Sequence, residues 1–179
     1  MNPIDIIEKY YDKNSKLYNI LIEHGLAVAK KSIDFAEKVK HLNPDLKFIE
    51  EAAMLHDIGI FLTHAPKIEC FGNEPYIRHG YLGKQILEKE GFYKHALVCE
   101  RHLGFGLSAQ DIKLQNLPLP QEDILPISIE EQIICFADNF FSKENPNKEK
   151  SIDMVKSLSL KYNGKNHFNN FNKWSEMFL

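Results

Sequence analysis

The chain has 179 residues, of which 44% are hydrophobic and 26% charged, a balance typical of a globular protein rather than of a fibre, a tail or a membrane protein. A chain of this size buries about 70% of the surface that its unfolded form exposes, so we expect a single domain over residues 1–179. Its 22 basic and 25 acidic residues give a formal net charge of −3 without a basic block, which argues against a nucleic-acid partner.

The cysteines and the amino-terminal residues indicate in which cellular compartment the protein is expected. Cys70, Cys99 and Cys135 form neither a C-x-x-C pair nor an even disulfide set, which favours a reducing environment. Residues 1–5 lack the basic flank and apolar run of a signal peptide, and no stretch approaches the roughly 18 apolar residues of a spanning helix. We therefore expect a cytoplasmic protein without a membrane partner.

The apolar residues recur with helical spacing, and no strand-like alternation competes with it, so the sequence predicts an all-α fold. Residues 16–40 show steps of three, four and seven, which predict an amphipathic helix with His24 inside its apolar stripe. A second helix is expected from about residue 46, and the glycine at position 59 predicts that it ends near His56 and Asp57.

The middle of the chain alternates between loops and helices. Residues 61–77 contain two prolines and a glycine without clean periodicity, which predicts an ordered loop or a short broken helix of the kind that often forms a lid. Helices are then predicted over residues 76–90 and 93–103, with His79 and His102 in line with apolar residues.

A connector and a further helix follow. Residues 117–126 hold three prolines, which remove backbone donors and restrict the residues before them, so no helix is expected there. A capping-box-like Ser-Ile-Glu-Glu at Ser128 predicts a long helix whose apolar face includes Phe141 and one polar member, Asp138.

After a polar break over residues 143–150, apolar spacing predicts one helix at about 152–158 and a terminal helix at about 168–178. The terminal helix carries an aromatic stripe of Phe168, Phe171, Trp174 and Phe178. Its helical period predicts docking on the core, with a homodimer interface as the alternative.

Six ionisable residues fall on apolar helix faces or at helix ends: His24, His56, Asp57, His79, His102 and Asp138. Any one histidine in such a place is more often a hydrogen-bonded core residue. Two buried aspartates beside four histidines, however, are costly unless a cation neutralises them, and helical bundles build metal sites from several facing helices. The set predicts an interior site for divalent iron, manganese, zinc, nickel or cobalt.

These residues lie in five short segments: His24-Gly25-Leu26-Ala27-Val28-Ala29, Leu55-His56-Asp57-Ile58-Gly59, Arg78-His79-Gly80, Glu100-Arg101-His102-Leu103-Gly104 and Cys135-Phe136-Ala137-Asp138-Asn139. In this order, the segments resemble the HD superfamily of metal-dependent phosphohydrolases, in its HDIG subgroup. The resemblance covers residues 24–141 and implies an HD-type helical bundle with a metal-binding core over about 16–145 and a helical extension over about 149–179.

The resemblance also implies the ligands. One metal ion would be held by His24, His56, Asp57 and Asp138, and a second by His79 and His102, with Asp57 bridging the two. Two metal ions can lower the pKa of a bridging water and offset the charge that develops on a phosphoryl group. Asp57 is then also the catalytic residue, which orients that water or accepts its proton.

The activity implied is hydrolysis of a phosphoester or phosphoanhydride in a small phosphorylated substrate, and the expected class is a nucleotide or dinucleoside polyphosphate. Many HDIG members have a lysine after the glycine, where this chain has Ile60, and the Gly-Tyr-Pro triplet of the HD-GYP subgroup is missing. Another phosphate anchor is therefore needed. The sequence offers four candidates: Arg101, Lys84, Arg78 and His64.

Two alternatives remain open from sequence. HD-fold di-iron oxygenases resemble the same set of four histidines and two aspartates. A regulatory domain could retain the metal site to bind a nucleotide without turnover, although we recognise no sensor or output motif within residues 1–179 and expect an enzyme.

Overall fold

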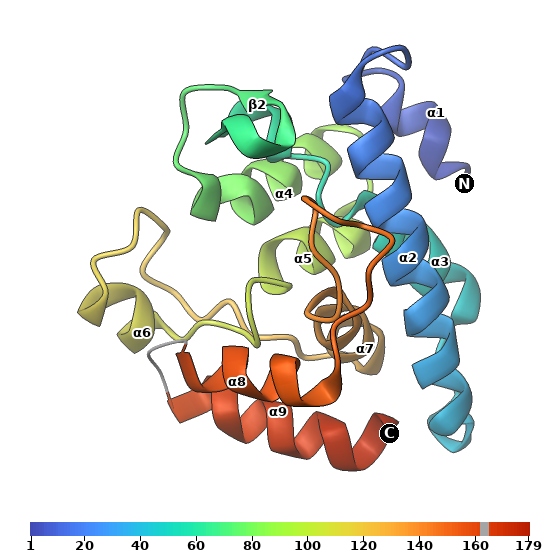
Figure 1. Cartoon of the computed structure of the whole chain (residues 1–179), viewed down its shortest axis with the longest axis vertical. Helices are drawn as coiled ribbons and strands as arrows, with labels where there is room; N and C mark the ends of the chain where they lie inside the picture. The colour runs from blue at the N-terminus through green and yellow to red at the C-terminus, as the bar shows by residue number, and fades with distance from the viewer. Residues whose placement is uncertain (162–164) are drawn as a thin grey trace.

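The structure is a computed structural model, describes residues 1–161 and 165–179, and is built mainly of helices, as predicted (Figure 1). The α-helices are α1 (Pro3–Ile7), α2 (Lys16–Lys38), α3 (Leu46–Leu55), α4 (His79–Lys89), α5 (Tyr93–Arg101), α6 (Ala109–Leu114), α7 (Ile129–Asp138), α8 (Ile152–Lys161) and α9 (Lys165–Phe178). Short 3₁₀ turns connect some of them: η1 (Lys40–Leu42), η2 (Ile60–Leu62), η3 (Pro66–Ile68) and η4 (Tyr76–Arg78).

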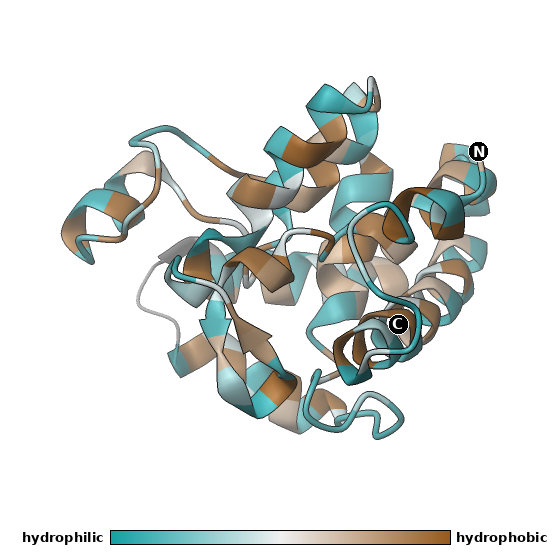
Figure 2. Cartoon of the chain, turned by 90° about the horizontal axis from the view of Figure 1, so that it is seen from above, coloured by the Kyte–Doolittle hydropathy of each residue, from teal (hydrophilic) through white to brown (hydrophobic). Residues whose placement is uncertain are grey.

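The long helix α2 packs against α3 and α7, and side-chain caps set where the helices begin (Figure 1). The Ser15 hydroxyl accepts a hydrogen bond from the Tyr18 amide at 3.1 Å, which satisfies an otherwise unpaired donor in the first turn of α2. Asp45 caps α3 in the same way, at 2.9 Å from the Phe48 amide. Brown and teal residues alternate around the helices, as amphipathic helices require (Figure 2).

Two buried apolar clusters meet along α2. The first cluster includes Val28 and Trp174 and is formed by residues of α2, α3, α5, α7 and α9. The second cluster includes Leu21 and Leu55 and is formed by residues in and around α1, α3, α4 and α5. His24 lies one helical turn from both Leu21 and Val28. His24, on the apolar face of α2, is therefore buried where the two clusters meet.

The turn after α3 approaches α4 closely at Gly59. A Cβ atom there would lie 2.3 Å from the His79 carbonyl oxygen and 2.5 Å from the Gly83 amide nitrogen. Only glycine fits between these backbones, and this close approach brings Asp57 next to the first residue of α4.

Some local predictions were wrong. Residues 64–71 contain a minimal hairpin in which β1 (His64–Ala65) pairs antiparallel with β2 (Cys70–Phe71), where no strand was predicted. The helix that begins after Ser128 is shorter than predicted, because α7 ends at Asp138 and Phe141 lies in the following loop. The sequence analysis also missed α1 and α6. Residues 117–126 form no helix, as predicted.

The C-terminal stripe docks on the protein's own core. Phe171, Trp174 and Phe178 are buried in the first cluster, whereas Phe168 is half-buried. These three aromatic side chains therefore pack within one chain, and a homodimer stays a prediction. Among the described residues, no helix has the length and apolar character needed to cross a membrane.

Candidate metal centre

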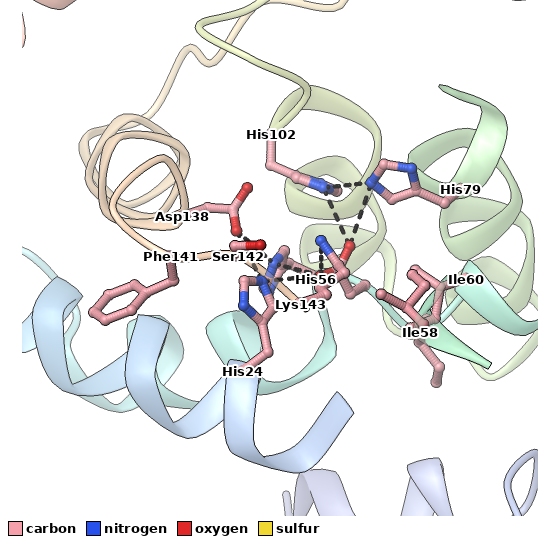
Figure 3. A network of polar contacts seen from close by, with 12 residues as sticks. His24, His56, Ile58, Ile60, His79, His102, Asp138, Phe141, Ser142 and Lys143 are labelled. Atoms are coloured by element: carbon pink, nitrogen blue, oxygen red, sulfur yellow. Dashed lines mark hydrogen bonds and ion pairs between the residues drawn. The ribbon is translucent and has the colours of Figure 1, made fainter. Parts of the chain in front are cut away.

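Four helix ends and one helix middle carry the six predicted site residues. His24 lies midway along α2, His56 caps the end of α3 with Asp57 next to it, and His79 opens α4. His102 caps the end of α5, and Asp138 is the last residue of α7. The structure brings all six side chains together from these elements, and Figure 3 shows the four histidines and Asp138 converging.

Four of the residues form a first group around two carboxylate oxygens. The Nε2 atom of His24 lies 3.2 Å from Asp57 Oδ2 and 2.9 Å from Asp138 Oδ1. The Nε2 atom of His56 lies 3.0 Å from the same Asp57 oxygen and 3.4 Å from the same Asp138 oxygen. Two imidazole nitrogens and two carboxylate oxygens thus face one point, a donor set that suits a divalent transition metal.

A second group uses the other oxygen of Asp57. The Nε2 atoms of His79 and His102 lie 3.3 and 3.5 Å from Asp57 Oδ1, and 3.0 Å from one another. Asp57 therefore offers one oxygen to each group, which is the geometry of a bridging carboxylate.

Backbone carbonyls orient three of the imidazole rings. The Nδ1 atoms of His56, His79 and His102 lie 2.6, 2.7 and 2.7 Å from the carbonyl oxygens of Ala53, Tyr76 and Cys99. Since a carbonyl only accepts, each Nδ1 carries the proton and, in the neutral ring, leaves a lone pair on Nε2. This is how metal-binding histidines are commonly held.

The hydrogen-bond pattern of the protein alone is incomplete at this point. Buried atoms without a hydrogen-bond partner include both nitrogens of His24, Nε2 of His56 and Oδ1 of Asp57, whereas Oδ2 of Asp57 is paired with the Lys143 ammonium at 2.6 Å. In neutral His79 and His102, two Nε2 lone pairs would also face each other across 3.0 Å. Such buried acceptors are costly unless a cation lies among them, so the residues present fit a metal ion.

The ionisation states follow from burial and from the two carboxylates. Burial raises the pKa of Asp57, but His56 and Lys143 outweigh it and hold the pKa well below its usual value. Burial lowers the pKa of His56, but Asp57 and Asp138 raise it overall to about 10. Burial lowers the pKa of His79 to about 3, so this ring is neutral and free to donate its lone pair.

The sequence analysis missed one residue at this centre. Lys143 lies in the loop after α7, and its Nζ atom is 2.6 Å from Asp57 Oδ2 (Figure 3). Its side chain is only 11% exposed. No periodicity could have revealed it, because it follows the end of the helix in a segment that was interpreted as a polar break.

A cavity of about 820 Å³ opens beside the centre. Its lining includes His79, His102, Asp138 and Lys143 from the centre itself. The rest comes from the segment after η2, from η4, from the segments around α6, from the loop after α7, and from α8 and α9. The loop at 61–77, predicted as a possible lid, contributes Ala65, Pro66, Lys67 and Ile68 to this wall.

The four candidate phosphate anchors do not line this cavity. Arg101 pairs with Glu131 at 3.0 Å, Lys84 with Glu100 at 2.7 Å and Arg78 with Glu74 at 2.6 Å. His64 is an exposed residue of β1. Glutamates engage three of these charges outside the cavity, and substrate binding by the four residues stays a prediction.

The helical bundle and the histidines and aspartates grouped around the Asp57 carboxylate place the chain among helical proteins with an interior site able to bind metal. Within this class the chain belongs to the HD domain family, whose profile matches residues 21–142. This match confirms the resemblance drawn from the five sequence segments.

Relatives of the chain share most of its length. It is 35% identical over 82% of its residues to an uncharacterized protein of Methanocaldococcus jannaschii, of which it covers 79%. It is also 29% and 30% identical to proteins of Thermoplasma volcanium and Picrophilus torridus named tRNA (cytidine(56)-2'-O)-methyltransferase. These two matches cover 78% and 86% of this chain but only 35% and 39% of the two longer proteins. No solved structure matches the chain.

Proposed function

We propose that this protein is a metal-dependent phosphohydrolase that cleaves a phosphoester or phosphoanhydride bond in a small phosphorylated compound. The observation that carries the proposal is Asp57, whose two oxygens serve two ligand groups beside a cavity. Membership of the HD domain family supports metal-dependent hydrolysis as the type of reaction.

The residues of the chain have distinct tasks in this chemistry. Metal ions held by the two groups would lower the pKa of a coordinated water and polarise a phosphoryl oxygen. Asp57 fixes the two groups relative to one another, because its carboxylate contacts both. The carbonyls of Ala53, Tyr76 and Cys99 accept a hydrogen bond from Nδ1 of three rings, so that Nε2 of each ring in its neutral form points to the site; His56 would have to lose a proton when a metal ion binds, because Asp57 and Asp138 raise its pKa to about 10.

The cavity supports a substrate of nucleotide size. Its volume of about 820 Å³ lies within the range of about 300–1,000 Å³ for small-molecule pockets. Away from the ligand groups, its wall includes Ile77, Leu103 and Leu117, which can pack on a flat apolar group such as a nucleobase. We therefore propose a nucleotide or dinucleoside polyphosphate as the substrate class.

The proposal is tested by phosphate release from nucleotides, dinucleoside polyphosphates and sugar phosphates after loading with manganese, iron, zinc, nickel or cobalt. Asp57→Asn keeps the shape of the side chain and removes its charge, and it is expected to lower the rate by about 10³-fold, since metal-ion stabilisation is worth several kcal/mol. Asp34→Asn, at an exposed position of the same helix as His24, is the control and should leave the rate unchanged.

Other outcomes would favour the alternatives. Two irons per chain with oxygen consumption and no phosphate release would indicate the di-iron oxygenase. Tight nucleotide binding without turnover, with cellular function retained in Asp57→Ala, would indicate a regulatory domain. We also propose that the protein works in the reducing cytoplasm, which the three unpaired, buried cysteines support.

A further inference from the structure

Lys143 reaches the centre because the loop after α7 is fixed by its own polar contacts. The Lys150 ammonium donates to the carbonyl oxygens of Asn139, at 3.0 Å, and Phe141. The Asn139 amide donates to the carbonyl oxygens of Gly104 at 2.6 Å and Cys135 at 2.8 Å. The loop is thus anchored to the last turn of α7 and to the segment after α5, and these contacts fix the path of the chain near Lys143.

The surroundings of the Lys143 ammonium are unusual for a lysine. It lies 2.6 Å from Asp57 Oδ2, the oxygen that His24 and His56 also approach at 3.2 and 3.0 Å. It also lies 5.9 Å from the centre of the Tyr76 ring. A buried ammonium is costly unless it is paired, so this side chain is placed here at an energetic cost that a surface lysine would avoid.

The other lysines of the cavity wall are engaged or exposed. Lys150 already donates to two backbone carbonyls, and Lys67 is 84% exposed, with its nearest carboxylate at 3.9 Å. Of the cavity-lining lysines that the structure describes, Lys143 alone contacts a residue of the ligand groups. Only one of its three ammonium protons is needed for Asp57.

We propose that Lys143 binds the phosphoryl group of the substrate and couples its binding to that of the metal ions, a role that rests on the proposed function. A metal ion in the first group would share the Asp57 oxygen that now pairs with Lys143, and the two cations would repel one another. An oxyanion between them removes that repulsion and accepts hydrogen bonds from the ammonium. Lys143 thereby supplies the phosphate anchor that Ile60 cannot.

The coupling predicts that phosphate and the metal ion each change the binding affinity of the other. Inorganic phosphate should tighten the binding of Mn²⁺, and by reciprocity Mn²⁺ should tighten the binding of phosphate by the same factor. We expect about a tenfold effect in the wild type, within the usual range for coupled sites. Without phosphate, removal of the lysine charge should leave Mn²⁺ binding equal or tighter, because the repulsion is gone.

The test is calorimetric titration of Mn²⁺ with and without inorganic phosphate, on the wild type, Lys143→Met and Lys143→Gln. Both neutral variants should bind Mn²⁺ and lose the effect of phosphate, and Gln provides a polar replacement if Met does not fold. Lys67→Met removes an exposed charge from the same wall and should retain the coupling.

Two results would overturn the proposal while leaving the proposed function intact: a phosphate effect that persists in both neutral variants, or metal binding without any phosphate effect in the wild type. Loss of Mn²⁺ binding in both neutral variants would also overturn it, because Lys143 would then support the ligands rather than the anion. Absence of metal binding in the wild type itself would instead overturn the proposed function.

Discussion

His79 and His102 show at the scale of single residues why this core needs a cation. Both rings donate from Nδ1 to a backbone carbonyl, and their Nε2 atoms lie 3.0 Å apart. A neutral pair in this state has no proton to share between those atoms. The two oxygens of Asp57 are likewise buried among four imidazole rings, and only Oδ2 is paired with an ammonium, that of Lys143. The arrangement is costly as a structural core and favourable as a ligand set.

Asp138→Asn tests how far the metal ion contributes to stability. Asp138 contacts both His24 and His56, so the variant is expected to bind metal weakly while keeping the shape of the side chain. At a metal concentration about 100-fold above Kd, bound metal stabilises the fold by about 2.7 kcal/mol, which the variant should lose. In metal-free protein the loss should be smaller, because the variant then loses only the pairing of Asp138 with His24 and His56. Urea unfolding with metal and with chelator measures both values.

The exposed Asp34→Asn is the matched control for this experiment and should unfold like the wild type under both conditions. Equal losses of stability with and without metal would show that Asp138 is a structural residue. Unchanged metal content in Asp138→Asn would remove it from the ligand set.

The six ligand-group residues could be predicted because each interrupts an apolar helical pattern or follows its end. Lys143 could not, since it lies in a loop whose path depends on contacts of Asn139 and Lys150 with distant backbone. The surroundings of the predicted phosphate anchors could not be predicted for a related reason. Arg101 and Lys84 adjoin or nearly adjoin site residues in sequence, but only the fold shows that Glu131 and Glu100 pair with them.

At the scale of elements, the turn between α3 and η2 decides whether the two ligand groups meet. Gly59→Ala would place a Cβ atom 2.3 Å from the His79 carbonyl and 2.5 Å from the Gly83 amide. Both neighbours are backbone, so α4 must shift away from Asp57. We expect a loss of about 1–3 kcal/mol, the usual cost of overpacking, together with weaker metal binding. Urea unfolding and metal titration would measure the two effects.

Gln85→Ala, at an exposed position of α4, is the control, and its effect should stay within about 0.5 kcal/mol. A Gly59→Ala protein with wild-type stability and metal affinity would contradict the importance of this close approach.

Long helices with clear periodicity, such as α2, were predictable from sequence, whereas the short elements depended on local detail. Helix α6 has only six residues, too few to show a period, although its capping box between Ser108 and Asp111 is a signal that could have been recognised. The hairpin of β1 and β2 has two residues per strand and leaves no alternation to detect. Helix α7 ends at Asp138, but the apolar pattern continues through Phe140 and Phe141, so the sequence gives no sign that the helix ends there.

At the scale of the whole molecule, α9 closes the first apolar cluster. Trp174 is 2% exposed and packs near Phe105 and Phe136, with ring centres 6.2 Å away in both cases. Trp174→Ala should therefore cost about 3–5 kcal/mol, as large aromatic truncations in cores do. The free energy of unfolding in urea, compared with that of Lys173→Ala at an exposed position of the same helix, checks this value.

A loss below about 1 kcal/mol in Trp174→Ala would mean that α9 is not docked as described. Dependence of the unfolding midpoint on protein concentration would instead indicate a homodimer as the place where this stripe is buried.

The central claim is that Asp57 joins two metal sites, one with His24, His56 and Asp138 and the other with His79 and His102. The most direct test is the number of transition-metal ions per chain, measured by elemental analysis of anaerobically purified and then metal-loaded protein. We predict two ions in the wild type, one in His102→Ala and none retained in Asp57→Asn. A wild type that binds fewer than two ions, or an Asp57→Asn protein with unchanged metal content, would contradict the claim.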